Sequence, residues 1–384
     1  MSAESALERA RTLIEAPLAP AVEQWKQAHP DGKVIGWFPV YSPVELTHAG
    51  GMLPVGVMGG GNQIEIAHAD SRFQSFVCSI IKSTLELGLT GQLKALDGLV
   101  FHSICDPAKN LASVMRRNFP ELWVEFIHFP QNLASPLAEE YLVAEYRRVL
   151  ERLAELIGST IGEADLRKSL SVYNENRARI RRLYQIRRES PQLLSATETY
   201  ALVRAGTLIP PEEHTALLDE ALDGLSRREV RPKDRIRVVV EGSFCEQPPV
   251  ELLQSIEEAG CDILDDDLLL GPRWFLDDVP VDGDPLRALA RSYVNGSVHS
   301  SVKHDLRRTK AEPLLEKVRR AGAQAVVVLA AKFCEPGLFD YALCRKALDE
   351  AGVPHIFLEF EEKMWIFDKI RTEVETFVES MLFE

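Results

Sequence analysis

Short apolar runs alternate with amphipathic stretches through roughly the first 135 residues of the chain. The apolar runs are KVIGWFPVY (33–41), MLPVGVMGGG (52–61), DGLVFHSIC (97–105) and WVEFIHFP (123–130). Between them, apolar residues recur at helical spacing, as in the stretch 71–89, and an amphipathic helix over about 4–28, interrupted around Pro17 and Pro20, precedes them all. Alternation of strands and helices in this way predicts a parallel, doubly wound sheet.

The pattern changes between about 136 and 228, where long charged helical stretches follow one another without a strand. Strand and helix alternate again from RIRVVVEGSF (235–244) through AQAVVVLAAKF (323–333) to a closing helix. We therefore predict an α/β protein with two doubly wound, Rossmann- or flavodoxin-like parallel-sheet domains joined by a helical insert. The predicted divisions are an N-terminal α/β domain with its leading helix (1–135), a helical connector (136–232) and a C-terminal α/β domain (233–384).

Composition and charge narrow the class of protein. The chain has 384 residues, enough for two domains with cores of their own, and its 46% hydrophobic and 27% charged content is typical of a globular protein. A net charge of −14 argues against a nucleic-acid partner, because phosphate binding needs clustered Lys and Arg. The chain shows no secretory signal and no apolar run long enough to span a membrane, so we expect a cytoplasmic protein.

The six cysteines carry the candidate chemistry, as reduced thiols or ligands rather than disulfides. Cys105 and Cys334 each follow an apolar run directly and stand just before a Pro and a helical pattern. That position lies beyond the carboxyl end of a parallel strand, where open α/β sheets bind ligands. Cys245, in VVVEGSFCEQPPVE, occupies the same kind of junction. Thiolates gathered there are suited to an iron–sulfur or other metal site.

Position alone ranks the other cysteines lower. Cys78 falls inside the helical pattern 71–89, so it qualifies only if that helix borders the crevice between the two domains. Cys261 opens a strand at its amino end, and Cys344 lies within an amphipathic helix; both are expected in the core.

Other polar motifs leave alternatives open. Because GxxxxGK[ST] and GxGxxG are both absent, we expect this chain to bind no nucleotide. The glycines of GVMGGGN (56–62) form a plain loop or let backbone approach a cofactor or thioester. Asp265, Asp266 and Asp267 form a solvated turn or hold a hard cation. Glu45 is either an acid or base facing the crevice or a residue that complements a helix dipole.

A run of arginines in the helical connector has two interpretations, a solvated helix face or a docking surface. Its members are Arg177, Arg179, Arg181, Arg182, Arg187 and Arg188.

The cysteine contexts together resemble the 2-hydroxyacyl-CoA dehydratase and benzoyl-CoA reductase family. The segments that carry the resemblance are FPVYSPVELTHAGGMLPV, SFVCSIIKS, FHSICDPAKN, VEGSFCEQPP, DDDLLLGPRWF and AAKFCEPGLFDY, and it extends from about residue 30 to the end. Within the family, GPRWF and KFCEPGLFDY look most similar to the smaller, cluster-binding subunit of ATP-dependent benzoyl-CoA reductase.

The resemblance implies a 4Fe–4S cluster held by three cysteines, which fall here on Cys78, Cys105 and Cys334. This ligand set differs from the one that position favours, so Cys245 stays as the challenger to Cys78. The resemblance also implies the partners: a paralogous larger cluster-bearing subunit, a separate ATPase activator dimer that receives electrons from ferredoxin, and an aryl-CoA thioester substrate. Glu45 and His102 are then candidate proton donors, and Trp274, Phe275 and Phe333 are candidates for an apolar wall that keeps the site dry.

The expected function is the iron–sulfur subunit of an ATP-dependent reductase that converts benzoyl-CoA to a cyclohexadiene-carbonyl-CoA. One alternative is the smaller subunit of a 2-hydroxyacyl-CoA dehydratase, which needs electrons only for activation. Another is a non-catalytic subunit that relays electrons without contacting substrate.

Overall fold

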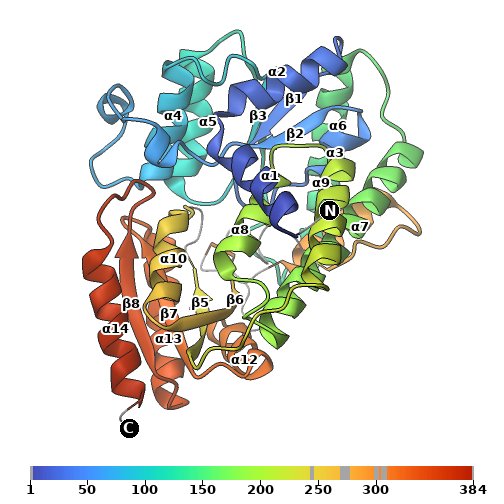
Figure 1. Cartoon of the computed structure of the whole chain (residues 1–384). Helices are drawn as coiled ribbons and strands as arrows, with labels where there is room; N and C mark the ends of the chain where they lie inside the picture. The colour runs from blue at the N-terminus through green and yellow to red at the C-terminus, as the bar shows by residue number, and fades with distance from the viewer. Residues whose placement is uncertain (1–2, 243–245, 269–276, 298–301, 304–308, 383–384) are drawn as a thin grey trace.

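Two parallel sheets joined by helices form the chain. The computed structural model describes residues 3–242, 246–268, 277–297, 302–303 and 309–382 (Figure 1). Each sheet has four strands, in the order β2-β1-β3-β4 in the first and β6-β5-β7-β8 in the second, with every pair parallel. The predicted fold class, with two doubly wound parallel sheets, is confirmed. Cys245, Trp274 and Phe275 lie outside the described residues.

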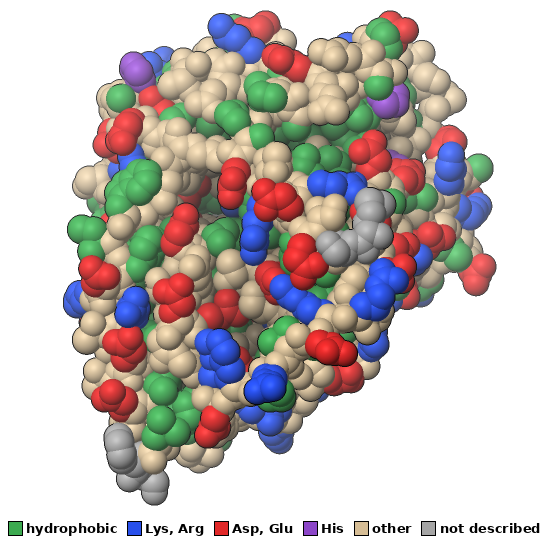
Figure 2. All heavy atoms as spheres, viewed as in Figure 1, with side chains coloured by type: hydrophobic (Ala, Val, Ile, Leu, Met, Phe, Trp, Pro, Cys, Tyr) green, Lys and Arg blue, Asp and Glu red, His purple; other side chains and the backbone are tan. Residues whose placement is uncertain are grey.

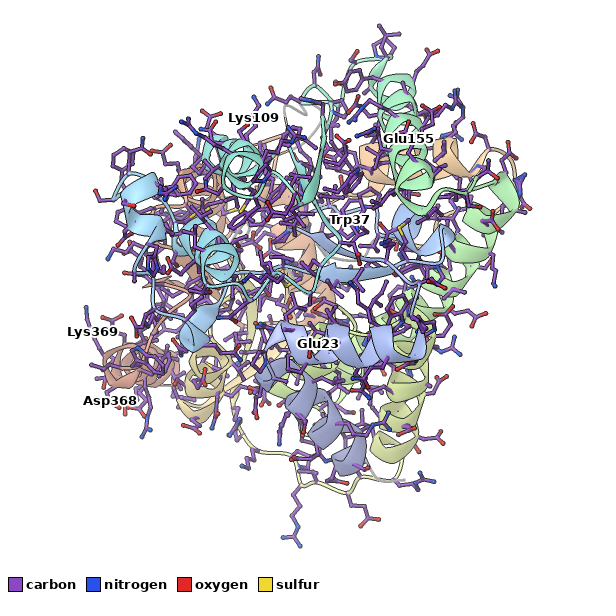
Figure 3. The ribbon with its side chains drawn as sticks, turned by 90° about the horizontal axis from the view of Figure 1, so that it is seen from above. Glu23, Trp37, Lys109, Glu155, Asp368 and Lys369 are labelled. Carbon is purple, nitrogen blue, oxygen red and sulfur yellow. The ribbon has the colours of Figure 1, made fainter. Side chains whose placement is uncertain are left out.

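The first sheet is built from the four apolar runs of the N-terminal part. Its strands are β1 (Val34–Trp37), β2 (Leu53–Gly56), β3 (Gly98–His102) and β4 (Trp123–Ile127). The helices of this part are α1 (Ala3–Glu15), α2 (Leu18–Ala28), α3 (Glu45–Ala49), α4 (Ser79–Leu89) and α5 (Asp106–Asn118), with short 3-10 turns η1 (Gly61–Gln63) and η2 (Ala69–Arg72). Trp37 lies in the middle of this unit, with Glu23 of α2 and Lys109 of α5 to either side (Figure 3).

Four helices without a strand follow the first sheet. They are α6 (Ala138–Ile157), α7 (Glu163–Glu189), α8 (Ala196–Ala205) and α9 (Pro211–Leu225). α1 packs against α8 and α9, and α7 packs against both α3 and β6. The middle helices therefore contact elements of both sheets (Figure 1).

The second sheet repeats the layout of the first. Its strands are β5 (Ile236–Glu241), β6 (Cys261–Asp266), β7 (Ala325–Ala331) and β8 (His355–Phe360), and its helices are α10 (Val250–Glu258), α11 (Pro285–Gly296), α12 (Ala311–Ala321), α13 (Glu335–Glu350) and α14 (Asp368–Leu382). Although α11 lies among these elements in sequence, it packs against α6 and α7.

Side-chain alternation along the strands divides the core of the second unit into two layers. Val239, Val326 and Val328 pack with Leu314 and Leu348 of α12 and α13. Their neighbours along the same strands, such as Val238, Val240 and Val327, point to the opposite face and join the core that continues into the first unit. Because successive residues of a strand face opposite sides, a fully apolar run is what a sheet covered on both faces requires.

The arginines of α7 are mostly tied to carboxylates inside the molecule. Arg177 pairs with Glu45 of α3, whereas Arg187 and Arg188 pair with Asp266 and Asp265 of β6 at 2.6 Å and 3.1 Å. The two predicted interpretations of this run, a solvated face and a docking surface, are therefore wrong for these three side chains. The helix is instead fastened to an element of each sheet unit.

The prediction of a solvated turn at the three aspartates is also wrong. Asp265, Asp266 and Asp267 are all buried, and Asp267 pairs with the buried Lys310. Buried carboxylates are stable only when they are paired or hydrogen-bonded, and each of these has a cationic partner.

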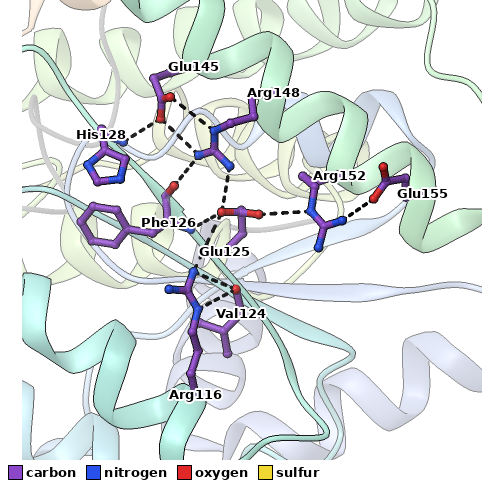
Figure 4. Close-up of polar contacts among 9 residues, drawn as sticks. All are labelled: Arg116, Val124, Glu125, Phe126, His128, Glu145, Arg148, Arg152 and Glu155. Carbon is purple, nitrogen blue, oxygen red and sulfur yellow. Dashed lines mark hydrogen bonds and ion pairs between the residues drawn. The ribbon is translucent and has the colours of Figure 1, made fainter.

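The outer edge of the first sheet is covered by arginines. Glu125 of β4 lies between Arg116, Arg148 and Arg152, and Arg148 also donates to the Phe126 carbonyl at 2.6 Å (Figure 4). These contacts occupy backbone and side-chain groups along an edge strand, which would otherwise offer open pairing sites. On the face shown in Figure 2, acidic and basic side chains are interspersed rather than gathered by sign.

None of the helices in the described part of the chain combines the length and apolar character that crossing a lipid bilayer requires.

Candidate metal centre

Three cysteines from distant parts of the sequence line one cavity. Cys78, Cys105 and Cys334 all border a cavity of about 470 Å³ between the two sheet units. Phe76, Phe333 and Phe339 line it as well, and all three are exposed. The cavity is thus bounded by soft sulfur donors inside and aromatic side chains at the surface.

Each of the three cysteines occupies the residue that begins a helix. Cys78 is the N-cap of α4, Cys105 of α5 and Cys334 of α13, and none of them uses its side chain to cap the helix. An N-cap is ordinarily Ser, Thr, Asp or Asn, whose oxygen accepts from the first turn. The partial positive charge of a helix N-terminus favours a thiolate. Three such helix ends border the same cavity.

The local sequence explains why these turns form. Cys105 and Cys334 come three residues after the last residue of β3 and of β7. In each helix an acidic residue of the first turn, Asp106 or Glu335, is followed by a Pro, which suits the start of a helix. The predicted strand-to-helix junctions are therefore confirmed for both cysteines.

Cys78 differs from the sequence-based expectation. The helical pattern 71–89 predicts a continuous helix with Cys78 inside it, but α4 begins only at Ser79, and η2 ends at Arg72. The prediction that Cys78 lies within a helix is wrong, because the preceding residues form a loop. As the N-cap of α4, Cys78 has the same relation to its helix as the other two cysteines have to theirs.

The turn before Cys334 adopts an unusual backbone conformation. Phe333 has φ 64°, in the left-handed region that favours glycine, and its side chain is 44% exposed. This conformation turns the chain from β7 into α13 within a few residues. It leaves Cys334 buried and facing the cavity while the Phe333 ring stays at the rim.

Burial outweighs the effect of the helix N-termini, so the protein alone does not favour thiolates at this site. Burial raises the pKa of the Cys78 thiol well above its ordinary value, and Glu246, Cys105 and Cys334 nearby raise it further. Burial likewise raises the pKa of Cys105, and Asp106 and Glu335 add to the effect. A positively charged group bound between the sulfurs would be needed to keep them ionised.

The donor set fits a cluster better than a single ion. Among the described residues, no group of three or more His, Cys, Asp or Glu side chains is arranged to hold one metal ion. Three cysteine sulfurs around a cavity of about 470 Å³ suit a group in which each sulfur binds a different iron. Soft thiolates are also the ligands that iron–sulfur clusters use.

Two other cysteines lie where the sequence predicts. Cys261 is the first residue of β6 and Cys344 lies within α13, and both are buried. Burial raises the pKa of Cys261 to about 12, which keeps this thiol protonated and inert. Neither of them lines the cavity of the three cysteines.

Glu45 lies in a different part of the structure. It is buried at the start of α3, pairs with Arg177, and lines a separate cavity of about 60 Å³ with Tyr41, Tyr146 and Tyr173. Among the described residues, the two cavities share no lining side chain. A proton-donor role for Glu45 stays a prediction.

His102 is fully buried at the end of β3 and lines neither cavity. Its Nε2–H donates to the Phe38 carbonyl at 3.0 Å, and burial lowers its pKa to about 3. Its other ring nitrogen, Nδ1, has no hydrogen-bond partner in the described part of the chain. His102 is thus neutral at physiological pH, and its role as a proton donor stays a prediction.

A pair of buried glutamates that no sequence motif singles out, Glu246 and Glu362, lies beside the cysteines. Glu246 lines the cysteine cavity and accepts from Ser79 Oγ at 2.6 Å, while the backbone N–H of Glu362 donates to it at 2.5 Å. Burial and the nearby Glu362 raise the pKa of Glu246 to about 8. Glu246 directly follows Cys245 in the sequence, but nothing in the charged stretch EFEEK points to a buried Glu362.

The glycine-rich loop also serves these glutamates. Gly59 has φ 77°, and a Cβ there would overlap the Glu362 carboxylate and Ser83 Oγ. The Gly61 N–H donates to Glu362 at 2.8 Å. The glycines of GVMGGGN thus allow backbone to approach a carboxylate from the second sheet unit.

Comparison with known proteins shows the family of the chain. The family described as 2-hydroxyglutaryl-CoA dehydratase, D-component, matches residues 39–381. The chain is 37% identical to a subunit of the benzoyl-CoA reductase of Thauera aromatica, over 99% of both chains. It is 32% identical to the beta subunit of the lactoyl-CoA dehydratase of Anaerotignum propionicum, over 94% of this chain and 95% of that one. With the beta subunit of the (R)-2-hydroxyglutaryl-CoA dehydratase of Acidaminococcus fermentans it shares 29% identity over 91% and 92% of the two chains. The chain belongs to the 2-hydroxyglutaryl-CoA dehydratase D-component family, whose relatives here are subunits of acyl-CoA dehydratases and of a benzoyl-CoA reductase.

Proposed function

We propose that this chain is the smaller, cluster-bearing subunit of an ATP-dependent benzoyl-CoA reductase, with Cys78, Cys105 and Cys334 as the ligands of one 4Fe–4S cluster. The observation that carries the proposal is the convergence of three helix-starting thiols on one cavity. The 37% identity to a benzoyl-CoA reductase subunit over nearly the whole chain supports the reductase among the activities of the family.

The residues around the cavity have distinct parts in this proposal. A bound cluster supplies one-electron transfer. The three thiolates hold it, and the N-termini of α4, α5 and α13 offset negative charge at the sulfurs. The rings of Phe76, Phe333 and Phe339 restrict water at the mouth, which protects a reactive intermediate.

The reaction balances as a two-electron reduction. The ring of benzoyl-CoA takes up two electrons and two protons and becomes a cyclohexadiene-carbonyl-CoA, while reduced ferredoxin is oxidised. Adding an electron to an aromatic thioester is strongly uphill, so ATP hydrolysis is coupled to the transfer. Because neither nucleotide-binding motif occurs in this chain, we assign ATP to a separate ATPase dimer that receives electrons from ferredoxin.

The relatives named as subunits support a partner subunit here. We propose a paralogous larger subunit that covers the exposed phenylalanines at the cavity mouth. Phe76 and Phe339 are 64% and 69% exposed, and apolar side chains gathered on a surface commonly mark an interface. The cytoplasm, where thiols stay reduced, is the proposed location.

The first test is anaerobic quantification of iron and acid-labile sulfide, with EPR, on the chain alone and co-purified with its larger partner. About four irons per chain are expected, the content of one cubane cluster. A preparation with the partner that still contains no iron would overturn the cluster proposal.

A dehydratase subunit is the second candidate, favoured by the family description and by the 32% identity to the beta subunit of a lactoyl-CoA dehydratase. Electron counting separates the two activities. A reductase consumes two electrons for each product molecule, whereas a dehydratase releases water with no net redox change. The assay contains the complete complex, ATP and a limiting amount of reductant. If the amount of product formed stops at half the amount of electrons supplied, in moles, the result supports the reductase. Many turnovers of a 2-hydroxyacyl-CoA for each electron supplied support the dehydratase.

A further inference from the structure

The first turn of α4 obtains its hydrogen-bond acceptor from a distant part of the chain. The first N–H groups of any helix lack partners within the helix, and a cap residue usually supplies one. The N-cap of α4, Cys78, makes no such bond with its side chain. Instead, Glu246, located between β5 and α10, accepts from the Ile80 N–H at 3.2 Å and from Ser79 Oγ at 2.6 Å.

Glu246 also joins α4 to the end of the second sheet. The Glu362 N–H, just beyond β8, donates to Glu246 Oε1 at 2.5 Å. The carboxylate of Glu362 in turn accepts from Ser83 Oγ of α4 at 2.6 Å. Both glutamates are buried, so water cannot take the place of these hydrogen bonds. Loss of one of them would leave a buried polar group without a partner, which is costly. Elements of the two sheet units are thereby fastened at the start of α4, next to Cys78.

The three cysteines differ in what holds them in place. Cys105 and Cys334 each follow a buried central strand, β3 or β7, within three residues, so the sheets position them. Cys78 follows a long segment, 57–77, that contains only two short 3-10 turns. It therefore depends on contacts from outside its own segment, and Glu246 supplies two of these to the residues directly after it.

We propose that Glu246 is a positioning residue that holds Cys78 in place opposite Cys105 and Cys334. This inference rests on the proposed function, in which these three cysteines bind one cluster. Oε1 accepts from both Ser79 and Glu362, and it does so whether or not Oε2 carries a proton. The role is thus one of geometry rather than of charge.

The chain offers a matched control in Glu257. Like Glu246, it is a glutamate that accepts from a backbone N–H and a hydroxyl in the first turn of a helix. The donors are Ala196 N–H at 2.7 Å and Thr197 Oγ at 2.6 Å, in α8. Glu257 does not line the cysteine cavity. Glu257→Ala therefore removes the same kind of contact without touching the segment of Cys78.

The test measures alkylation rates of individual thiols in the chain without iron, by iodoacetamide labelling and peptide mass spectrometry. Loss of three buried hydrogen bonds in Glu246→Ala, two of them to the residues directly after Cys78, is expected to raise the rate at Cys78 about tenfold, with less than about twofold change at Cys105 and Cys334. Glu257→Ala should leave all three rates within about twofold of the unaltered chain. Equal increases at all three cysteines, or no increase at Cys78, would overturn the proposal.

Milder variants keep the test decisive if Glu246→Ala does not fold. Ser79→Ala removes one donor to Glu246 and should raise the Cys78 rate about threefold, whereas Thr197→Ala, its counterpart at Glu257, should not. Glu246→Gln retains the oxygen that serves Ser79 and Glu362 but loses the acceptor of the Ile80 N–H, so its Cys78 rate should lie between those of the unaltered chain and Glu246→Ala. A Glu246→Gln chain as reactive at Cys78 as Glu246→Ala would contradict the geometric role.

Iron content separates this inference from the proposed function. If the unaltered chain takes up iron and sulfide anaerobically, Glu246→Ala should hold less than half as much as Glu257→Ala, with an altered EPR signal. If the unaltered chain holds no iron, the proposed function fails, while the alkylation rates still decide whether Glu246 positions Cys78.

Discussion

The two cavities that contain the predicted site residues differ in how their polar groups are used. Around the cysteines, a space of about 470 Å³ is lined by three sulfurs and opens past exposed phenylalanines. Around Glu45, a space of only about 60 Å³ is lined by tyrosines, and the carboxylate is already paired with Arg177. Both contain chemically capable side chains, but only the first leaves room for a group of cluster size.

The two cavities therefore contain side chains with different roles, since some are placed to bind a ligand and others connect structural elements to each other. A buried carboxylate that meets an arginine from another element neutralises that charge and holds the two elements together. Glu45 and Arg177 connect α3 to α7 in this way. Thiols at the starts of three helices, by contrast, line one cavity, which is the observation on which the proposed cluster rests.

The largest expected effect is loss of iron from single cysteine variants. We predict that Cys78→Ala, Cys105→Ala and Cys334→Ala each lose most of the iron of the anaerobically purified complex, because a cubane that lacks one of three protein ligands is poorly held. Cys261→Ala and Cys344→Ala, which remove buried thiols away from the cavity, are the controls and should keep it. If the Cys78→Ala complex retains its iron and the Cys245→Ala complex loses it, Cys245 rather than Cys78 is the third ligand.

The next effect concerns the Glu45 cavity and should appear in stability rather than in iron content. Glu45→Gln leaves the largely buried Arg177 without its carboxylate, and we expect the free energy of unfolding to fall by about 3 kcal/mol. Denaturant unfolding measures this loss, and the double variant Glu45→Gln/Arg177→Met should recover part of it. Loss of iron in a folded Glu45→Gln complex would break the distinction between the two cavities.

From the burial of His102 we predict that the free energy of unfolding depends on pH, and the expected effect is of intermediate size. Its pKa is about 3 in the folded chain and near its ordinary value of 6.5 when unfolded. The unfolded chain therefore binds the additional proton, so stability is full above pH 6.5 and is lost as the pH falls toward 3. Between about pH 7 and pH 5 this group should account for a loss of about 2 kcal/mol.

The measurement compares the unaltered chain with His102→Gln, which keeps a donor for the Phe38 carbonyl but does not titrate. Buried carboxyls with raised pKa values, such as Glu246, change stability in the opposite direction. The prediction therefore concerns the difference between the two chains, obtained from unfolding curves at each pH. Identical pH dependence in both chains would show that His102 does not titrate as its burial requires.

The smallest effect is expected at the arginines over the edge of the first sheet. Arg152 is half exposed and contacts Glu125 at 3.5 Å (Figure 4). Arg152→Ala should change the free energy of unfolding by less than about 1 kcal/mol, since solvent screens such pairs. The same unfolding assay used for Glu45→Gln measures it. A loss as large as that of Glu45→Gln would mean that burial does not distinguish the two ion pairs.

The sequence predicts secondary structure correctly where the local pattern of residues and the topology of the fold agree. The apolar runs predicted the strands, and the Pro after Cys105 and after Cys334 predicted the start of a helix at the end of a strand. Parallel strands share one carboxyl edge, so cysteines at these junctions are expected to lie near a ligand site. The apolar spacing of 71–89 predicts a helix that contains Cys78, although the residues between η2 and α4 form a loop.

The sequence by itself determined the two α/β units, the helical middle and two of the three cysteine turns, because these depend on short-range periodicity and on residues that start or end helices. Only the tertiary structure decided which charges are buried. The arginines of α7 and the aspartates at the end of β6 have the composition of solvated segments, yet they pair across more than 70 positions of sequence. The same holds for Glu246 and Glu362, which are ordinary charged residues until the two sheet units bring them together beside Cys78. Local pattern cannot predict such pairs, because the energy that buries a charge comes from a partner whose place is set by the whole fold.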